Sequence, residues 1–321
     1  MGKVWAAPFC CIFKQDKNLE SKPPLWRVQT RFNIVILLGH SNGAKVAPLE
    51  SGMQLYHHPY SLNSQRVRLA LEEKGIDYTT YHVNPVTGEN LDSSFFRMNP
   101  SARLPVFKNG AHVIFDPVEI IQYIERVSII SSSSDSEHAS LTNNDVFKWM
   151  KKLQEWDSTY FTLSHVPIKY RGPVSKFIRR VVIARMAEFP DLAAMYHLKL
   201  KDTYSTEAKL GDPSELQRCK KQIIDLLDEV EDRLKETPYV AGHEHSMADV
   251  MLIPILARLA LLNLEDEYIS CRPNVHEYWV SAQKWPSYRK VIGAYFHGWR
   301  KYRTLITTWC YVRCRSALKR Y

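Results

Sequence analysis

Two serines stand where a helix start would give their hydroxyls a chemical role. Ser61 and Ser64 follow a predicted short strand at 54–57 and open a predicted helix at 64–74. The unpaired amides and the dipole at a helix start stabilise an anion. A Cys-x-x-Cys pair there would exchange disulfides. A hydroxyl cannot, but it can donate a hydrogen bond to the thiolate of a bound ligand. The alternative is that the serines only cap the helix.

Two proline-containing pairs lie further along the chain. Leu104-Pro105 precedes a predicted hairpin, and a cis bond there would leave the Leu104 backbone groups available to pair with a peptide-like ligand. Pro105 could equally do no more than start the strand. Asp116 precedes Pro117 at the start of a predicted helix, where its carboxylate would accept the amine of a ligand or only cap the helix.

The elements that must position these residues follow a recognisable order. Strands are predicted at 54–57 and 78–83, with the helix at 64–74 between them ending at Gly75. A hairpin is predicted from strands at 104–108 and 111–115, joined by a two-residue turn at Asn109-Gly110. A helix begins at Pro117 after Asp116. The order β-α-β-α-β-β-α predicts a thioredoxin-like α/β domain over 53–128.

The second half of the chain is predicted to be all helix. A Ser-rich segment at 129–144 reads as a linker, because a run of serines can bury nothing. Helices are predicted at 145–162, 173–188, 190–204, 216–234 and 246–262, and one opens at 285–288. We therefore expect an all-helical domain over 145–297.

Composition excludes several classes of protein. The chain has 321 residues, 45% of them apolar and 24% charged, which is ordinary globular usage and rules out collagen-like, mucin-like and wholly disordered chains. No apolar run reaches the ~18 residues of a membrane span. Six cysteines are too few and too scattered for a disulfide scaffold, and Cys310 and Cys314 lack partners at zinc-site spacing, so no metal is expected.

The positive charge gathers at the two ends. The formal charge is +9; residues 1–52 hold seven Lys/Arg against three Asp/Glu, and residues 298–321 hold seven Lys/Arg and no acid. We expect 1–52 to be an extension, disordered or absent from the mature chain. The basic, aromatic composition of 298–321 suits an amphipathic helix on an anionic membrane surface, or an ordinary terminal helix packed on the domain. Nucleic-acid binding is not expected, because no recognition fold accompanies the tail.

Four motifs in order carry a family resemblance. Residues 58–75, 99–107, 115–124 and 246–249 together resemble glutathione S-transferases, most closely the plant class named after bacterial tetrachlorohydroquinone dehalogenase. The resemblance implies conjugation of glutathione, the co-substrate, to electrophilic small molecules, as in detoxification. It implies that Ser61 stabilises the glutathione thiolate. It also implies that glutathione lies against the following residues: Arg103, Leu104, Pro105, Asp116 and Pro117.

Departures from the family pattern bear on activity. Pro117 replaces a serine whose hydroxyl and backbone N–H hold the γ-glutamyl end, and Asp116 is one methylene shorter than the usual Glu. Asn63 stands where dehalogenase-like members have a Cys that forms a mixed disulfide with glutathione, so reductive dehalogenation is not expected.

The resemblance also implies a cellular setting. Members pair as homodimers, and we expect a cytoplasmic protein, peripheral at the plasma membrane if 298–321 binds lipid. The long basic stretch at 169–209 resembles the enlarged helical region of the ganglioside-induced differentiation-associated proteins. This favours an alternative, a membrane-associated scaffold or sensor with weak or no catalysis.

Overall fold

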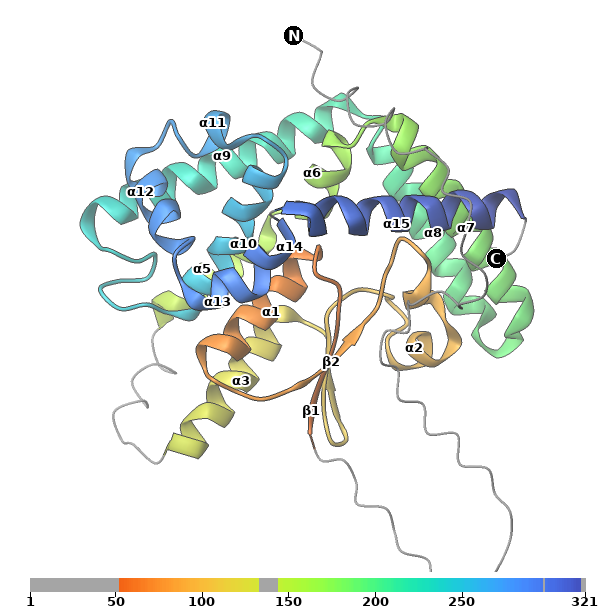
Figure 1. The fold of residues 1–321 in the computed structure, drawn as a ribbon, viewed down its shortest axis with the longest axis horizontal. Coiled ribbons are helices and arrows are strands. Elements are labelled where there is room, and N and C mark those ends of the chain that lie inside the picture. The colour runs from red at the N-terminus through yellow and green to blue at the C-terminus, as the bar shows by residue number, and fades with distance from the viewer. Residues whose placement is uncertain (1–51, 133–143, 297, 319–321) are drawn as a thin grey trace, which may run out of the picture. The chain divides into compact units, whose positions relative to one another are not determined.

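The computed structural model describes residues 52–132, 144–296 and 298–318, which belong to one compact unit (Figure 1). The extension expected at 1–52 lies outside the described residues apart from Gly52, and so does most of the expected linker. Helix α3 (Pro117–Ser132) runs into the range expected to be linker.

The first domain has the predicted thioredoxin-like sheet. Its strand order is β2-β1-β3-β4, in which β1 (Met53–His57) pairs in parallel with β2 (Thr79–His82) and antiparallel with β3 (Val106–Asn109). Strand β4 (His112–Ile114) pairs with β3. Side chains alternate between the two faces. Leu55 and Phe107 join the core with α1 (Leu62–Glu73) and α3, whereas Val106 packs with Phe95 of α2 (Ser93–Met98).

The hairpin turn lies one residue later than predicted. Asn109 pairs with His112, so the turn is Gly110-Ala111 rather than Asn109-Gly110. Gly110 has φ +58°, and Ala111 is not among the residues with positive φ. A glycine at the first central position is the requirement of a type II′ turn, which fits strand twist as well as the Asn-Gly type does.

The second half is helical, with boundaries that differ from the predictions. Asp157 accepts a hydrogen bond from the Tyr160 N–H and starts a new helix, which splits the expected 145–162 helix in two. The helix expected from 173 begins five residues earlier and contains Pro173, and a 3₁₀ turn, η3 (Pro190–Leu192), precedes the next helix. The larger helices are α5 (Asn144–Glu155), α6 (Ser158–His165), α7 (Ile168–Glu188), α8 (Ala193–Lys209), α9 (Pro213–Glu236), α10 (Met247–Leu261), α12 (Pro273–Ala282) and α15 (Gly298–Ala317).

Short elements complete the helical half. They are α11 (Glu265–Tyr268), α13 (Pro286–Tyr288), a π turn η4 (Arg289–Gly293) and α14 (Ala294–Phe296). Among the described residues, no helix has the length and apolar character that a membrane span requires.

A buried arginine joins the two domains. Arg66 of α1 is 2% exposed. Its guanidinium donates to the carbonyl oxygens of Leu153 on α5 (2.7 Å) and Met251 on α10 (3.2 Å), and to Asn63 Oδ1 (3.0 Å). Burial lowers the pKa of Arg66 to about 9, against the raising effect of the Asp116 charge. The helix that follows Ser61 is therefore fixed to the helical domain by hydrogen bonds that water cannot replace.

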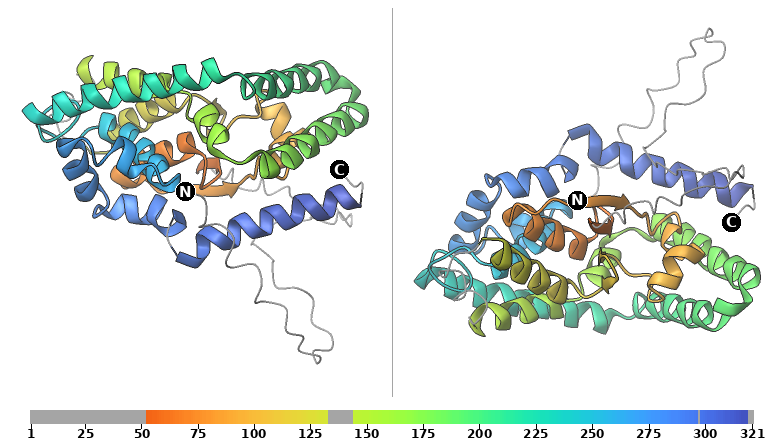
Figure 2. Two further views of the ribbon diagram at one scale, coloured as in Figure 1. Left: turned by 90° about the horizontal axis from the view of Figure 1, so that it is seen from above. Right: turned by 90° about the horizontal axis from the view of Figure 1, so that it is seen from below.

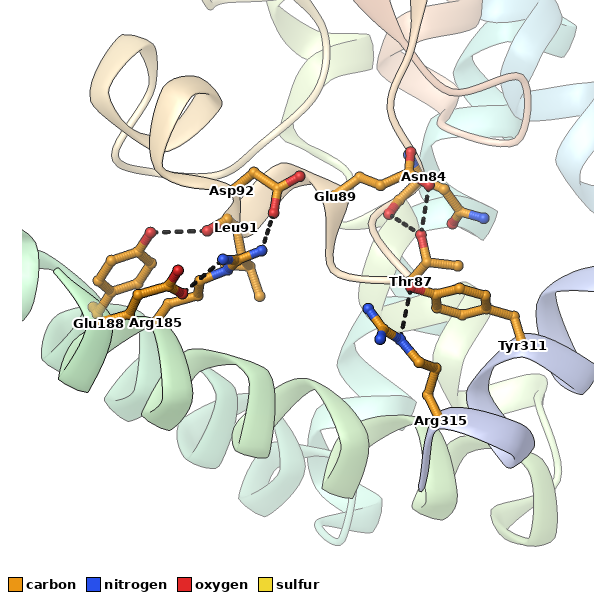
Figure 3. A network of polar contacts seen from close by, with 10 residues as sticks. Asn84, Thr87, Glu89, Leu91, Asp92, Arg185, Glu188, Tyr311 and Arg315 are labelled. Carbon is orange, nitrogen blue, oxygen red and sulfur yellow. Dashed lines mark hydrogen bonds and ion pairs between the residues drawn. The ribbon is translucent and has the colours of Figure 1, made fainter. Parts of the chain in front are cut away.

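The α7–α8 pair packs against α2 and the 3₁₀ turn η1 (Glu89–Leu91), away from the core that contains α1 and α3. Phe96 stacks on Tyr196 with ring centroids 4.1 Å apart, and the Tyr196 hydroxyl donates to the Leu91 carbonyl at 2.8 Å. Arg185 of α7 pairs with Asp92 beside this contact (Figure 3). The long basic stretch at 169–209 therefore packs against the first domain.

Histidines gather where β1 and β2 end. The ring of His57 lies 4.8 Å from that of His82, and the ring of His58 lies 6.4 Å from the same ring, between centroids. Burial, with Arg68 and the neighbouring imidazoles, lowers the pKa of His57 to about 2. Burial, His82 and Arg258 lower that of His58 to about 4. No group of three or more His, Cys, Asp or Glu in the described residues could hold a metal ion.

Arg66→Met should lower the free energy of unfolding by about 2–4 kcal/mol, because two buried carbonyls lose their donor. Urea unfolding of the variant and of the wild type measures this free energy. Arg126→Met, at an exposed position of α3, is the control and should change stability by less than ~0.5 kcal/mol. An Arg66→Met protein as stable as the wild type would show that the guanidinium is dispensable.

Stability should fall as the pH drops from 7.5 to 5. An unfolded histidine takes up a proton near pH 6.5, whereas folded His57 and His58 do so only near 2 and 4. Protons therefore bind the unfolded chain first, and each of these histidines costs up to ~1.4 kcal/mol per pH unit below 6.5. Denaturant midpoints at each pH measure this. His58→Gln should flatten the slope and the exposed His112→Gln should not; equal stability at both pH values would contradict the assignment.

Candidate functional site

Ser61 caps helix α1 and faces the edge of the sheet where β1 ends. Its backbone is extended, and its Oγ accepts the Ser64 N–H at 3.4 Å. The sequence indicated Ser61 and Ser64 as possible caps of the helix, and the structure assigns the cap to Ser61. The cap uses the oxygen only as an acceptor, so the hydroxyl hydrogen stays available for a ligand. Ser61 is partly exposed, whereas Ser64 is buried.

Leu104 and Pro105 lie directly before β3, at the same edge of the sheet. The Leu104–Pro105 peptide bond is cis, one of the two possibilities raised by the sequence. Pro105 is buried and Leu104 is partly buried. Arg103 has an exposed side chain, while its carbonyl accepts Asn99 Nδ2 at 2.9 Å. Leu104 precedes the ladder, which begins at Val106.

Asp116 caps α3 and also contacts the helical domain. Its Oδ1 accepts the N–H groups of Val118 (2.9 Å) and Glu119 (3.1 Å). Its Oδ2 accepts the side-chain amide of Gln154 from α5. Pro117 is buried at the first position of the helix, where a missing N–H costs nothing to the helix itself. The capping role considered from the sequence is therefore confirmed. Both oxygens of the Asp116 carboxylate already accept hydrogen bonds within the protein.

Sheet topology brings these residues to one edge. Strand β1 ends where β3 begins, because they are antiparallel with Tyr56 opposite Val106. Strand β4 ends opposite Phe107, near the start of β3. The beginnings of α1, β3 and α3 therefore share an edge, and Ser61, Leu104 and Asp116 line it. This edge offers a hydroxyl donor, the Leu104 backbone ahead of the β3 ladder, and a carboxylate, a set that suits a peptide-like thiol.

The loop that leads into Ser61 is held from the helical domain. Tyr60 stacks on Phe296, and its hydroxyl donates to the Tyr295 carbonyl at 3.1 Å. Arg258 of α10 donates to the Tyr60 carbonyl and to Thr162 Oγ1 (3.2 Å). Burial lowers the pKa of Arg258 to about 10. The loop before Ser61 is thus positioned by tertiary contacts as well as by its own turn residues.

Sequence reasoning missed Arg66, Tyr60, Gln154 and Arg258. Arg66 and Arg258 are charged residues inside predicted helices, where a solvent-facing side chain is the usual outcome. Gln154 contacts Asp116 across 38 positions of sequence. Nothing in local spacing indicates such contacts; Tyr60 and Arg66 had a signal only in that both lie in the motif at 58–75.

Comparison with family models and known proteins agrees with this fold. Residues 51–126 match the glutathione S-transferase N-terminal domain, and residues 213–279 match the glutathione S-transferase C-terminal domain. The chain is 61% identical to "Glutathione S-transferase TCHQD" of Arabidopsis thaliana, over 84% of this chain and 100% of that protein. It is 26% identical to a tetrachloro-p-hydroquinone reductive dehalogenase of Sphingobium chlorophenolicum, over 71% of this chain and 90% of the relative.

Solved structures share the fold. Glutathione transferase F2 from Populus trichocarpa superposes with a TM-score of 0.53 at 18% identity, covering 78% of this chain and 99% of that one. Poplar glutathione transferase F1 gives 0.54 at 17% identity, over 78% and 98%. The sheet and the helical second half had already indicated this architecture. With the near full-length relative at 61% identity, they show that the chain belongs to the glutathione S-transferases, in the TCHQD class.

Proposed function

We propose that the chain conjugates the thiolate of glutathione to electrophilic small molecules, with Ser61 as the residue that stabilises the thiolate. The observation that carries the proposal is the position of Ser61 at the N-cap of α1, with its hydroxyl hydrogen not used by the cap. The hydroxyl and the helix N-terminus both favour a negative charge at this point.

The chemistry follows from the thiol pKa. A free thiol titrates near ~8.5, so only a few per cent is thiolate at pH 7. A hydrogen bond from Ser61 to the sulfur favours the thiolate and releases the thiol proton to water. The sulfur then attacks the electrophilic carbon, a C–S bond forms, and the leaving group departs with the bonding electron pair. Where the electrophile is a conjugated carbonyl without a leaving group, the sulfur bonds to one carbon of the double bond, and the other carbon receives the electron pair and takes up a proton from water.

The rest of glutathione would extend along the same edge of the sheet. The Leu104 backbone beside Pro105 pairs with the cysteinyl part in this proposal, and Arg103 lies next to it. Asp116 and Pro117 lie at the γ-glutamyl end. A theta-class relative from Xanthomonas axonopodis pv. citri is described with glutathione bound, at a TM-score of 0.52 and 16% identity, which supports this edge through the shared fold.

We propose no reductive dehalogenation. That reaction needs a protein thiol to form a mixed disulfide with glutathione, and Asn63 stands at the position in question. Its Oδ1 already accepts a hydrogen bond from Arg66. The bacterial relative that is named as a dehalogenase shares 26% identity with this chain.

A second candidate function is a glutathione transferase-like protein with weak or no catalysis. It is favoured by the Asp116 carboxylate, which is already engaged by the α3 cap and by Gln154, and by Pro117, which has no donor. Glutathione binding separates the two candidates. The homodimer and the cytoplasmic location stay predictions.

Ser61→Ala should lower the rate of conjugation with chlorodinitrobenzene by about 100-fold, because the thiolate loses its hydrogen-bond donor. Ser246→Ala is the matched control, since Ser246 is the N-cap of α10 and its Oγ accepts the Ala248 N–H at 3.3 Å. Both variants should lose ~1 kcal/mol of stability with their caps, and only Ser61→Ala should lose turnover. Unchanged turnover in Ser61→Ala would refute the serine-type assignment.

Pro117→Ser should tighten glutathione binding by roughly fivefold or more, since it supplies a hydroxyl and a backbone N–H to a buried ligand carboxylate. Isothermal titration of the full chain measures it. Pro286→Ser, a proline at the same first-turn position of α13, is the control and should leave affinity unchanged. An equal or weaker affinity in Pro117→Ser would place the γ-glutamyl end elsewhere.

A further inference from the structure

We propose that α15 docks the protein on the surface of an anionic membrane. The contact surface is a stripe of Trp299, Tyr302, Ile306 and Trp309, named here the α15 stripe, with Arg303 and Arg313 beside and beyond it. This inference concerns the exposed side of α15 rather than the residues proposed to bind glutathione, and it holds whether or not the chain conjugates glutathione.

The α15 stripe is a single face of one helix. Its members follow each other at intervals of three, four and three residues, which places them on one side of an α-helix. Trp299 is 66% exposed and Trp309 41%, with Tyr302 and Ile306 between these values. Folding leaves these large apolar side chains in contact with water, and a contiguous exposed patch of this kind marks an interaction site.

The opposite face attaches α15 to the body of the protein. Val312 is 1% exposed and belongs to the core that α7 and α8 share with α2. Tyr311 contacts Phe177 of α7 edge to face, and Thr308 Oγ1 accepts Asn84 Nδ2 at 3.3 Å. Figure 2 shows α15 at one edge of the described residues, with none of their other elements over its outer side. These contacts on one side of α15 therefore leave the α15 stripe facing the solvent.

The charge of α15 suits anionic lipid. The helix carries Arg300, Lys301, Arg303, Arg313 and Arg315 and no acidic residue. Arg303 and Arg313 are exposed, and the guanidinium of Arg313 lies 5.6 Å from the centre of the Trp309 ring. Aromatic rings settle at the level of the lipid headgroups, where cationic side chains meet phosphate. Since the described residues contain no spanning helix, α15 would lie on the membrane rather than cross it.

A second copy of the chain fits the α15 stripe less well. An acidic hollow lies between α5 and α9, lined by Asp145, Glu229, Asp232 and Glu236. Lys148 already pairs with Asp145 and Lys152 with Glu229, so part of this acidity is neutralised. Among the residues that line the hollow, Trp149 is the single large apolar one, against four in the α15 stripe. Self-association is therefore an outcome of the test rather than the proposal.

The experiment is sedimentation of the full chain with vesicles of phosphatidylcholine alone and with vesicles containing 30% phosphatidylserine. The wild type should bind the anionic vesicles and release them at high salt. Arg303→Gln with Arg313→Gln should lower the partition coefficient by roughly 25-fold, about fivefold for each arginine. Trp299→Ser with Trp309→Ser should lower it by at least tenfold.

Matched controls come from other surfaces. Ile224→Ser with Val280→Ser changes apolar residues of 40% and 41% exposure, and Lys221→Gln with Arg126→Gln removes two exposed charges. Both controls should bind like the wild type, and so should Ser61→Ala.

Three results would overturn the proposal. The first is a wild type that ignores anionic vesicles. The second is stripe variants that bind as well as the controls. The third is a wild-type oligomer, seen by analytical ultracentrifugation without lipid, that dissociates when the α15 stripe is changed, because the stripe would then face a second copy.

Discussion

The buried guanidinium of Arg66 is the constraint from which the geometry of the site follows. A charged group in this core is tolerated only if its donors are satisfied, and the satisfying oxygens belong to α5 and α10. These helices must therefore approach α1 in one register. The same α5 carries Gln154 to Asp116, so one set of polar contacts places both the helix that Ser61 caps and the carboxylate at the other end of the site.

The remaining helices extend this frame on two sides. The α7–α8 pair covers η1 and α2 through the stacked rings of Phe96 and Tyr196, while α14 and α15 hold the loop at Tyr60 and the segment after β2. The thioredoxin-like domain is thus partly enclosed by helices of its own chain, at α2 and η1, at the Tyr60 loop and at the segment after β2. This enclosure also fixes which side of α15 faces outward.

The residues predicted from sequence were those whose roles are local. A cap is set by a side chain and the amides two or three residues on, so Ser61 and Asp116 could be identified from their positions before helices. The hairpin was predicted, but its turn was placed one residue early, because Asn-Gly and Gly-Ala both satisfy a two-residue turn and only pairing with β1 fixes the register. The break at Asp157 was missed because apolar spacing continues across it.

By itself, the sequence determined the order of the elements and the motifs of the family, and it predicted the residues that are proposed to bind a thiol. Only the tertiary structure decided that Arg66 and Arg258 point inward, that Asp116 is shared with Gln154, and that one face of α15 is buried while the aromatic face is exposed. The physical reason is the distance along the chain over which each interaction acts. Caps, turns and periodicity act over a few residues, whereas the burial of a charge or of a helix face depends on partners that lie far away in the chain.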